Sequence, residues 1–275
     1  MKKIFIILLG IVMLSSCFSG ESSLINPDGM TVETRFLTPD GYERKKAEDG
    51  DFLSFLRNYE LKEDNAPVCL YNGDEKFNQF DHWAVFKLPI EQKDLQQCAD
   101  SVIRVYAEYY YKIGRDEKIK FHFTNGFLCE WQKWKEGYRV KIEGNNTEWE
   151  KTASFDGSYE NFKKYLETVF LYAGTKSMET YESETIDVSE LNAGDVFLKG
   201  GSPGHVVMVV DKIENSHGKK AFLLAQGLMP AQEFHIIKNP KRKNDPWYYE
   251  EDITFPFKTQ NYTYDSGSAV KRLLY

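Results

Sequence analysis

Apolar side chains recur every three or four residues in three segments of the chain, a spacing that predicts amphipathic helices. The longest segment runs from Asp94 to Gly114, where an Asp and a Gln fit a capping pair and the glycine supplies a stop. A second helix is expected over residues 159–173, with Ser158 as its N-cap. The segment DFLSFLRNYEL, residues 51–61, predicts a shorter helix. All three predicted helices therefore precede the last third of the chain.

Period-two alternation and short apolar runs between turn residues predict the strands. Strands are expected at residues 68–71, 83–88, 119–127, 137–144, 195–197, 205–211, 221–226 and 233–237. The last four follow one another with short connections, which is typical of antiparallel neighbours. Helices early in the chain and a meander of strands late in it indicate an α+β fold, with helices packed on an antiparallel sheet.

The chain begins with MKKIFIILLGIVMLSSC, in which two lysines precede an apolar run of eleven residues. This pattern predicts an export signal. The run is too short to cross a bilayer as a helix, which takes about 20 apolar residues. The residues LSSC, ending at Cys17, resemble the lipobox of bacterial lipoprotein signal peptides, and the resemblance implies that Cys17 is lipidated. Ordinary secretion, with Cys17 lost or unmodified, is the alternative.

Cleavage before Cys17 would divide the chain into a signal peptide (residues 1–16), a lipidated tether (residues 17–31) and a single α+β domain (residues 32–275). The tether is predicted from its short, polar composition, which is rich in Ser, Gly and Pro. Removal of the signal would leave 275 − 16 = 259 residues. We expect the protein to be lipid-anchored at the outer membrane, facing the periplasm or the cell surface.

The protein is acidic, with a formal net charge of −7 that becomes −7 − 2 = −9 once the two signal lysines are lost. It has no basic stripe that would bind a phosphate backbone, so nucleic acid is not an expected partner. Anionic headgroups would repel the protein, and the lipid on Cys17 is therefore expected to make the membrane contact. The histidines and cysteines lack metal-binding spacings such as HExxH or CxxC, so no metal or other cofactor is expected.

Three cysteines would remain in the mature chain: Cys69, Cys98 and Cys129. An odd number leaves at least one thiol unpaired within the chain, even where export permits disulfides. Cys69 and Cys129 lie in or beside predicted strands, and fit either packed thiols or a disulfide. Cys98 lies in the first turns of the longest predicted helix, whose positive end favours a thiolate. The alternative for Cys98 is a small apolar residue packed in the core.

A cysteine becomes an effective nucleophile when a histidine takes its proton and a third polar group orients the ring. His205 begins a predicted strand directly after a glycine-rich turn. A hairpin centred near Ser216 would bring Gln226 close to this histidine. Cys98, His205 and Gln226 could therefore meet in one site. The alternatives are an imidazole hydrogen-bonded to backbone and a glutamine that satisfies a turn.

The segments GDVFL, residues 194–198, and GHVVMVV, residues 204–210, resemble the second half of NlpC-type cell-wall peptidases, which are papain-like cysteine enzymes. The resemblance implies an NlpC-like, papain-like fold with Cys98 as nucleophile, His205 as base and Gln226 as the orienting residue. It also implies a thiol hydrolase that cleaves an amide or ester bond of cell-envelope material. The chain departs from that family at Cys98, where it reads QCAD instead of Asp, Cys, Ser and Gly, and in the long insert that follows.

Strings spread over most of the chain resemble an uncharacterised family of bacterial lipoproteins built on a domain of unknown function. Among them are DLQQCADSVIRVYAEY, FTNGF, FLLAQGLMPAQEFHI and DPWY. This resemblance implies one globular unit from about Val32 to the C-terminus, and it names no reaction. The alternative function is a non-catalytic module of the same fold that binds peptidoglycan, another glycan or a peptide. Its binding residues would be Trp131, Trp134, Trp149 and Trp247.

Overall fold

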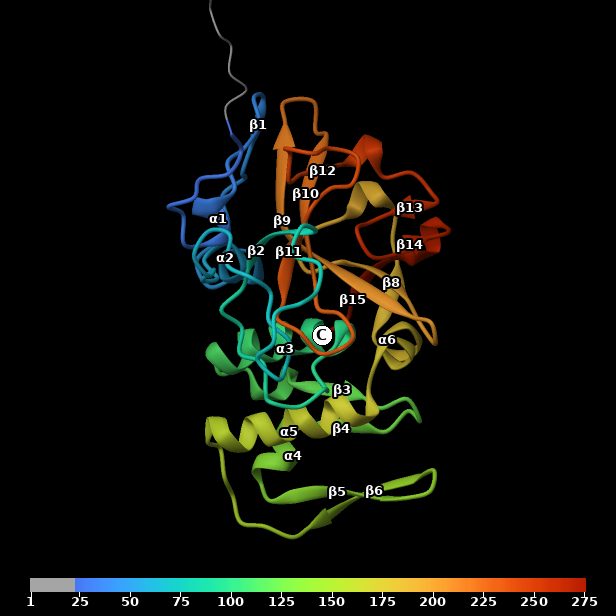
Figure 1. The fold of residues 1–275 in the computed structure, drawn as a ribbon. Coiled ribbons are helices and arrows are strands. Elements are labelled where there is room, and N and C mark those ends of the chain that lie inside the picture. Colours follow the sequence, from blue (N-terminus) through green and yellow to red (C-terminus); the bar gives the residue numbers. More distant parts are fainter. Residues whose placement is uncertain (1–22) are drawn as a thin grey trace, which may run out of the picture.

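A nine-stranded antiparallel sheet is the main feature of residues 23–275, the part of the chain that the computed structural model describes (Figure 1). The main path of this sheet is β2-β11-β10-β9-β8-β15-β7, with β1 paired to β9 and β12 paired to β10. Its strands are β1 (Tyr42–Glu43), β2 (His82–Val85), β7 (Ser183–Thr185), β8 (Val196–Lys199), β9 (His205–Asn215), β10 (Lys220–Gln226), β11 (His235–Ile237), β12 (Tyr248–Tyr249) and β15 (Val270–Leu273). Three two-stranded sheets add β3 (Lys120–His122) with β4 (Leu128–Glu130), β5 (Tyr138–Glu143) with β6 (Asn146–Lys151), and β13 (Phe257–Lys258) with β14 (Thr263–Tyr264).

The helices pack mainly on one side and one end of this sheet, as Figure 1 shows. They are α1 (Val32–Arg35), α2 (Phe52–Arg57), α3 (Cys98–Lys112), α4 (Trp131–Lys135), α5 (Tyr159–Tyr172) and α6 (Thr175–Tyr181). None of these six, which lie in residues 23–275, combines the length and the apolar character needed to cross a membrane. The predicted α+β class, with helices packed on an antiparallel sheet, is confirmed.

The side chains of the central strand β9 alternate between the two faces of the sheet, and those on both faces are buried. Val206 and Met208 belong to the larger buried cluster, to which α3 and α5 also contribute. Val207 and Val209 belong to a second buried cluster, which includes Tyr264 of the β13–β14 hairpin. The continuous apolar run in the sequence of β9 is therefore explained by a strand that is covered on both faces.

One of the two capping signals predicted for the long helices is found in the structure and the other is not. The helix predicted over residues 159–173 is α5, and Ser158 caps it as expected. The longest helix, α3, begins at Cys98, later than predicted. Asp94 does not cap it, since the Asp94 carboxylate accepts a hydrogen bond from the distant Ala231 amide at 2.7 Å. A side chain that resembles a cap in the sequence instead bonds the loop between β10 and β11.

The four late strands are β8 to β11, so the predicted meander is confirmed. The strand predicted at residues 68–71 is wrong, because this segment makes only isolated bridges. The tight turn at Gly73, where φ is +88°, bends the chain back at once, and the Leu70 amide bonds the Asp74 carbonyl oxygen at 2.8 Å. This local pairing leaves no length for a regular ladder.

The predicted signal peptide, residues 1–16, and the predicted lipidation site, Cys17, lie outside the residues that the structure describes. The same is true of the first part of the predicted tether. Cleavage, lipidation and the division of the chain at these points therefore stay predictions.

Candidate functional site

Cys98 is the first residue of α3, at the helix end where backbone amides have no acceptor within the helix. The preceding Gln97 is extended, and its amide donates to the Asp100 carboxylate at 3.0 Å, which fixes the start of the helix. The thiol therefore lies at the positive end of a helix of 15 residues. The sequence suggested a position farther into the helix, and the observed position suits a reactive thiol better.

His205 begins β9 and Gln226 ends β10, and both side chains are buried. The Nε2 atom of His205 lies 2.8 Å from Oε1 of Gln226. The last registered pair of the two strands is Met208 with Ala225, so this contact is diagonal and not directly across the ladder. The ring of Tyr262, from the turn between β13 and β14, lies 5.3 Å from the imidazole, measured between centroids. One polar partner and one aromatic neighbour thus hold the imidazole.

The start of α3 packs directly against the end of β10, and Gly227 permits this approach. A Cβ atom added at Gly227 would lie 2.8 Å from the carbonyl oxygen of Gln97 and would overlap the hydroxyl of Ser101. Real Cβ atoms essentially never approach other atoms so closely. The absence of a side chain at this position therefore lets the helix that carries the thiol reach the strand that carries Gln226.

Cys98 and His205 meet the same short piece of backbone. The backbone amide of Val206, which follows His205, lies close enough to the Cys98 sulfur to lower the pKa of the thiol. Within residues 23–275, no hydrogen bond joins the sulfur to either ring nitrogen of His205. The structure thus brings His205 and Gln226 into direct contact, and it places Cys98 at the same end of β9.

The thiol and the imidazole are both neutral at rest. Burial raises the pKa of Cys98, the charge of Asp100 adds to this, and amide hydrogen bonds, including that of Val206, oppose it. Burial also raises the pKa of Asp100 to about 8, so this carboxyl is largely uncharged at neutral pH. Burial is therefore the main cause of the raised Cys98 pKa. Burial lowers the pKa of His205, and the hydrogen bond to Gln226 only partly opposes it. A neutral imidazole can accept a proton, which is what a general base requires.

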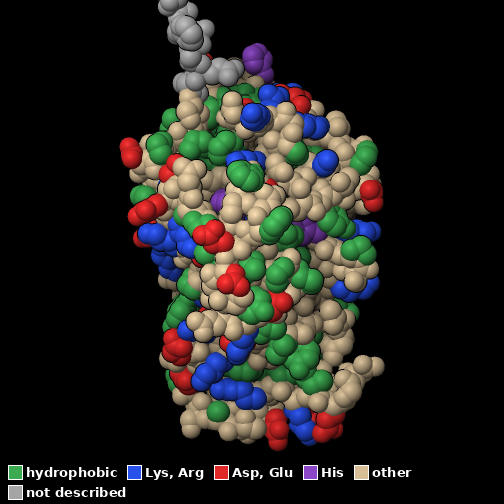
Figure 2. All heavy atoms as spheres, in the orientation of Figure 1, with side chains coloured by type: hydrophobic (Ala, Val, Ile, Leu, Met, Phe, Trp, Pro, Cys, Tyr) green, Lys and Arg blue, Asp and Glu red, His purple; other side chains and the backbone are tan. Residues whose placement is uncertain are grey.

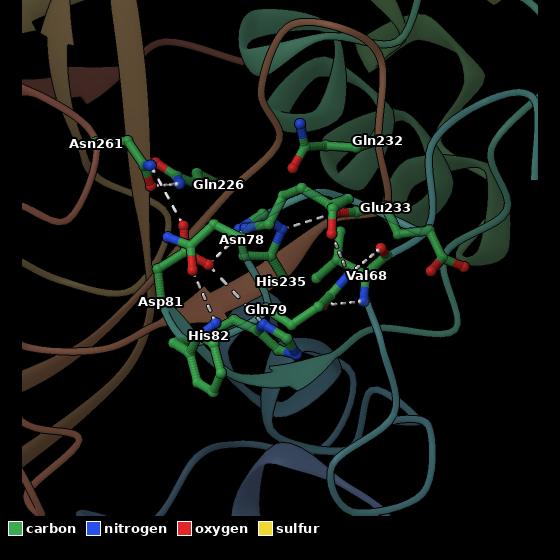
Figure 3. A network of polar contacts seen from close by, with 12 residues as sticks. Val68, Asn78, Gln79, Asp81, His82, Gln226, Gln232, Glu233, His235 and Asn261 are labelled. Carbon is green, nitrogen blue, oxygen red and sulfur yellow. Dashed lines mark hydrogen bonds and ion pairs between the residues drawn. The ribbon is translucent and has the colours of Figure 1, made fainter. Parts of the chain in front are cut away.

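A chain of hydrogen bonds continues from Gln226 away from the imidazole (Figure 3). The Gln226 Nε2 atom donates to Asn261 Oδ1 at 2.5 Å, and Asn261 Nδ2 donates to Asp81 Oδ2 at 3.3 Å. The ammonium of Lys76 donates to the other Asp81 oxygen at 2.5 Å. Sequence reasoning missed Asn261 and Asp81, because these residues lie 180 positions apart and outside any recognisable motif.

Two further histidines lie beside Asp81, with ring centroids 5.9 Å apart. His235 Nδ1 bonds the Glu233 carbonyl oxygen at 2.8 Å, and His82 Nε2 bonds the Ala66 carbonyl oxygen at 3.1 Å. Their other ring nitrogens are buried without a hydrogen-bond partner, and Nδ1 of His82 lies 3.9 Å from Asp81 Oδ1. In the described part of the chain, no three His, Cys, Asp or Glu side chains are arranged to hold a metal ion. The pair therefore consists of two buried imidazoles, each held by one backbone carbonyl.

Acid is expected to destabilise the protein through these buried imidazoles. Burial lowers the pKa of His235 from 6.5 to about 3 and also lowers the pKa of His82. Between pH 6.5 and about 3 the unfolded chain therefore binds a proton at His235 that the folded chain does not. The free energy of unfolding should consequently fall as the pH falls, by about 1.4 kcal/mol per pH unit for each such group.

Urea unfolding at a series of acidic pH values measures this slope. His235→Gln removes the titrating group and is expected to flatten the slope relative to the wild type. His217→Gln, the same substitution in the exposed turn between β9 and β10, serves as the control and should leave the slope unchanged. Identical slopes in the wild type and in His235→Gln would contradict the prediction.

Cys69, Cys98 and Cys129 are all free thiols. Cys69 and Cys129 are therefore packed thiols and do not form a disulfide. Cys129 is buried in β4, and burial raises its pKa well above the usual value. Burial also raises the pKa of Cys69, which lies in a loop away from any helix start. Neither of these two thiols is the first residue of a helix, as Cys98 is of α3. Cys98 is thus the thiol whose surroundings fit nucleophilic chemistry.

The tryptophans that were predicted to contact a ligand are buried or partly buried. Trp131, Trp134 and Trp247 are 1%, 6% and 0% exposed, so their predicted role as surface contacts in a binding module is wrong. Trp149 is partly buried and packs against the main apolar cluster. The physical reason is that large aromatic side chains contribute most when they are removed from water. Trp131 and Trp134 pack against Tyr165 of α5, and Trp247 Nε1 donates to the Leu37 carbonyl oxygen.

Comparison with known proteins identifies a family but no function. No curated protein and no solved structure gives a significant match to the chain. A protein family described as "Domain of unknown function (4846)" matches residues 32–272, which include Cys98, His205 and Gln226. This match spans most of the chain. The protein therefore belongs to the family of the Domain of unknown function (4846).

Proposed function

We propose that the protein is a thiol hydrolase with Cys98 as nucleophile, His205 as base and Gln226 as the residue that orients the base. The observation that carries the proposal is the hydrogen bond of 2.8 Å between His205 and Gln226, at the end of β9 that meets the first residue of α3. A thiol at a helix start and an oriented imidazole beside it are the parts that nucleophilic catalysis by cysteine needs.

A papain-like, NlpC-like fold is part of the same proposal. The helix with the cysteine comes first in the chain, and two adjacent antiparallel strands then supply the histidine and the polar residue. This order and placement agree with the resemblance of GDVFL and GHVVMVV to the NlpC-type peptidases. The sequence supports the remaining parts of the proposal: a lipid on Cys17, a place at the outer membrane, and an amide or ester of cell-envelope material as substrate.

The proposed reaction is acyl transfer to the thiol and then to water. The Cys98 thiol gives its proton to Nδ1 of His205 while the sulfur attacks the carbonyl carbon, and the carbonyl electron pair moves onto oxygen. Collapse of this intermediate breaks the bond to the leaving amine or alcohol, which takes the proton from the ring. Water then attacks the thioester, its proton passes by way of His205 to the departing sulfur, and the carboxylic acid is released. The backbone amide of Cys98 is the expected oxyanion donor.

A non-catalytic binding module for peptidoglycan, another glycan or a peptide is the second candidate function. Phe77 and Phe80 favour it, because these side chains are 104% and 86% exposed and lie in the loop that leads to Asp81. Figure 2 shows hydrophobic side chains gathered over the middle and lower part of one face, with charged groups between them. Exposed aromatic side chains are typical of surfaces that contact ligands.

Labelling with iodoacetamide at neutral pH distinguishes the two functions. If His205 accepts the proton of Cys98, labelling of Cys98 should be at least about tenfold faster in the wild type than in His205→Ala. Peptide mass spectrometry follows each cysteine separately, so the partly buried Cys69 is an internal reference and the buried Cys129 is a negative control. Equal and slow labelling of Cys98 in both proteins would exclude the hydrolase and favour the binding module.

A further inference from the structure

We infer that Asp81 and Asn261 are positioning residues for His205. They act through Gln226, which Figure 3 shows beside Asn261 and Asp81, and they keep the His205 ring hydrogen on Nε2 and the free electron pair on Nδ1. The inference rests on the proposed function for its purpose, because Nδ1 is the atom that would take the proton of Cys98. The order of the hydrogen bonds is a separate property of the protein and can be measured without any substrate.

Asp81 fixes the outer end of this network because its carboxylate can only accept hydrogen bonds. The side chain is buried, and its Oδ1 atom accepts a hydrogen bond from the ammonium of Lys76 at 2.5 Å. Burial alone would raise the pKa of Asp81, but the hydrogen bond and the charge of Lys76 outweigh this effect and hold the pKa below its usual value. Asp81 is therefore ionised at neutral pH, and its Oδ2 atom requires a donor.

The two amide side chains carry this requirement to the imidazole. The group that faces Asp81 Oδ2 at 3.3 Å must be the nitrogen of Asn261. The Asn261 oxygen then faces Gln226 at 2.5 Å and requires the Gln226 nitrogen there. The Gln226 oxygen is left to face His205 at 2.8 Å, and an oxygen of this kind can only accept. The hydrogen of the neutral ring must consequently be on Nε2.

The opposite orientation of the two amide side chains would place two hydrogen-bond acceptors against each other. If both amides rotated, the Asn261 oxygen would face the Asp81 carboxylate, and two acceptors would oppose each other without a hydrogen. The Gln226 nitrogen would then face His205, whose hydrogen would have to move to Nδ1, where it would block transfer of a proton from the thiol. Because Gln226 and His205 are 0% and 3% exposed, solvent cannot replace a hydrogen bond lost there.

The fold holds Asn261 in place for this contact. The Thr259 amide and hydroxyl both donate to the Tyr262 carbonyl oxygen, at 2.9 and 3.1 Å, and close the turn between β13 and β14. The same turn places the Tyr262 ring beside His205. Asn261 itself is exposed, so no requirement of the core explains an amide at this position. Its contacts are with the two buried groups that it connects.

Asp81→Asn is the sharpest test, because it replaces one oxygen by a nitrogen. The remaining oxygen is expected to face the Lys76 ammonium, which leaves an NH₂ group facing Asn261. Both amides would then rotate, and the ring hydrogen of His205 would move from Nε2 to Nδ1. Two-bond ¹H–¹⁵N NMR correlations of the imidazole show which nitrogen carries the hydrogen. We expect Nε2–H in the wild type and mainly Nδ1–H in Asp81→Asn.

Asp195→Asn is the matched control. Asp195 is as buried as Asp81, with both at 4% exposure, and it bonds Arg272 at 3.0 Å outside the network. This variant should leave the His205 ring unchanged. Asn261 lies in an exposed turn, so Asn261→Ala should fold and provides the test if Asp81→Asn does not fold. We expect both the Nε2–H and the Nδ1–H forms of His205 in the spectrum of Asn261→Ala. Nδ1–H in the wild type, or Nε2–H alone in every folded network variant, would overturn the inference.

Labelling of Cys98 separates this inference from the proposed function. If both hold, Asp81→Asn should label Cys98 as slowly as His205→Ala does. If the ring hydrogen follows Asp81 while labelling is indifferent to His205, the inference stands and the hydrolase fails. If labelling depends on His205 while the ring hydrogen stays on Nε2 in Asp81→Asn, the inference fails and the hydrolase stands.

Discussion

Replacing Cys98 by serine is expected to abolish the proposed hydrolysis of cell-envelope amides or esters, with a loss of at least about 10³-fold in kcat/KM. A hydroxyl is far less acidic than a thiol, and His205 is poorly equipped to take its proton, because burial lowers the pKa of the ring and its partner is the amide of Gln226 and not a carboxylate. The substitution changes one atom at the first residue of α3, so the start of the helix should be retained. Mass spectrometry of peptidoglycan fragments incubated with the purified full-length chain measures the products.

Cys69→Ser is the matched control, since it makes the same change at another free and partly buried cysteine. This variant should keep the activity of the wild type. Mass spectrometry of the intact protein should also find the acyl group on Cys98 when a slow ester is the substrate. Undiminished hydrolysis by Cys98→Ser would contradict the mechanism. Wild-type protein that binds the fragments and never cleaves them would point to the binding module.

The late part of the fold could be predicted because its signals are local. The strands β8 to β11 are short apolar runs between turn residues, and neighbouring strands in the chain are neighbours in the sheet. Ser158 identified the start of α5 because a serine cap bonds the backbone of the next turn. The closeness of Gln226 to His205 also followed from a local feature, the hairpin that joins β9 to β10.

The rest depends on contacts between distant residues, which a single sequence does not encode in a readable way. Asp94 has the spacing of a helix cap and instead bonds the Ala231 amide, which moved the predicted start of α3 away from Cys98. Asp81 and Asn261 carry no motif, and only the folded chain brings them to Gln226. The tryptophans illustrate a different limit, because an aromatic side chain suits a core and a binding surface equally well until its exposure is known.

The strand that carries the candidate base is held in place from its other half as well. Asp211 lies on β9 beyond the apolar run that starts at His205, and it is fully buried. Its two oxygens accept hydrogen bonds from Nε of Arg44 and Nε of Arg57, each at 2.8 Å. Both guanidinium groups also donate to backbone carbonyl oxygens, such as that of Phe36. One carboxylate therefore joins α2 and the segment before it to the central strand.

Asp211→Ala is expected to lower the free energy of unfolding by about 3–5 kcal/mol, because it leaves two guanidinium groups without their shared anion in a buried site. Chemical denaturation with a two-state fit measures the change. Glu43→Ala is the control, since it removes the carboxylate of a surface pair with Lys45 at 2.7 Å, and such exposed pairs contribute little. A stability of Asp211→Ala within the error of the wild type would show that the arginines find other partners. In that case the pairing of β1 with β9 and the apolar contacts would be enough to attach the N-terminal segment to the sheet.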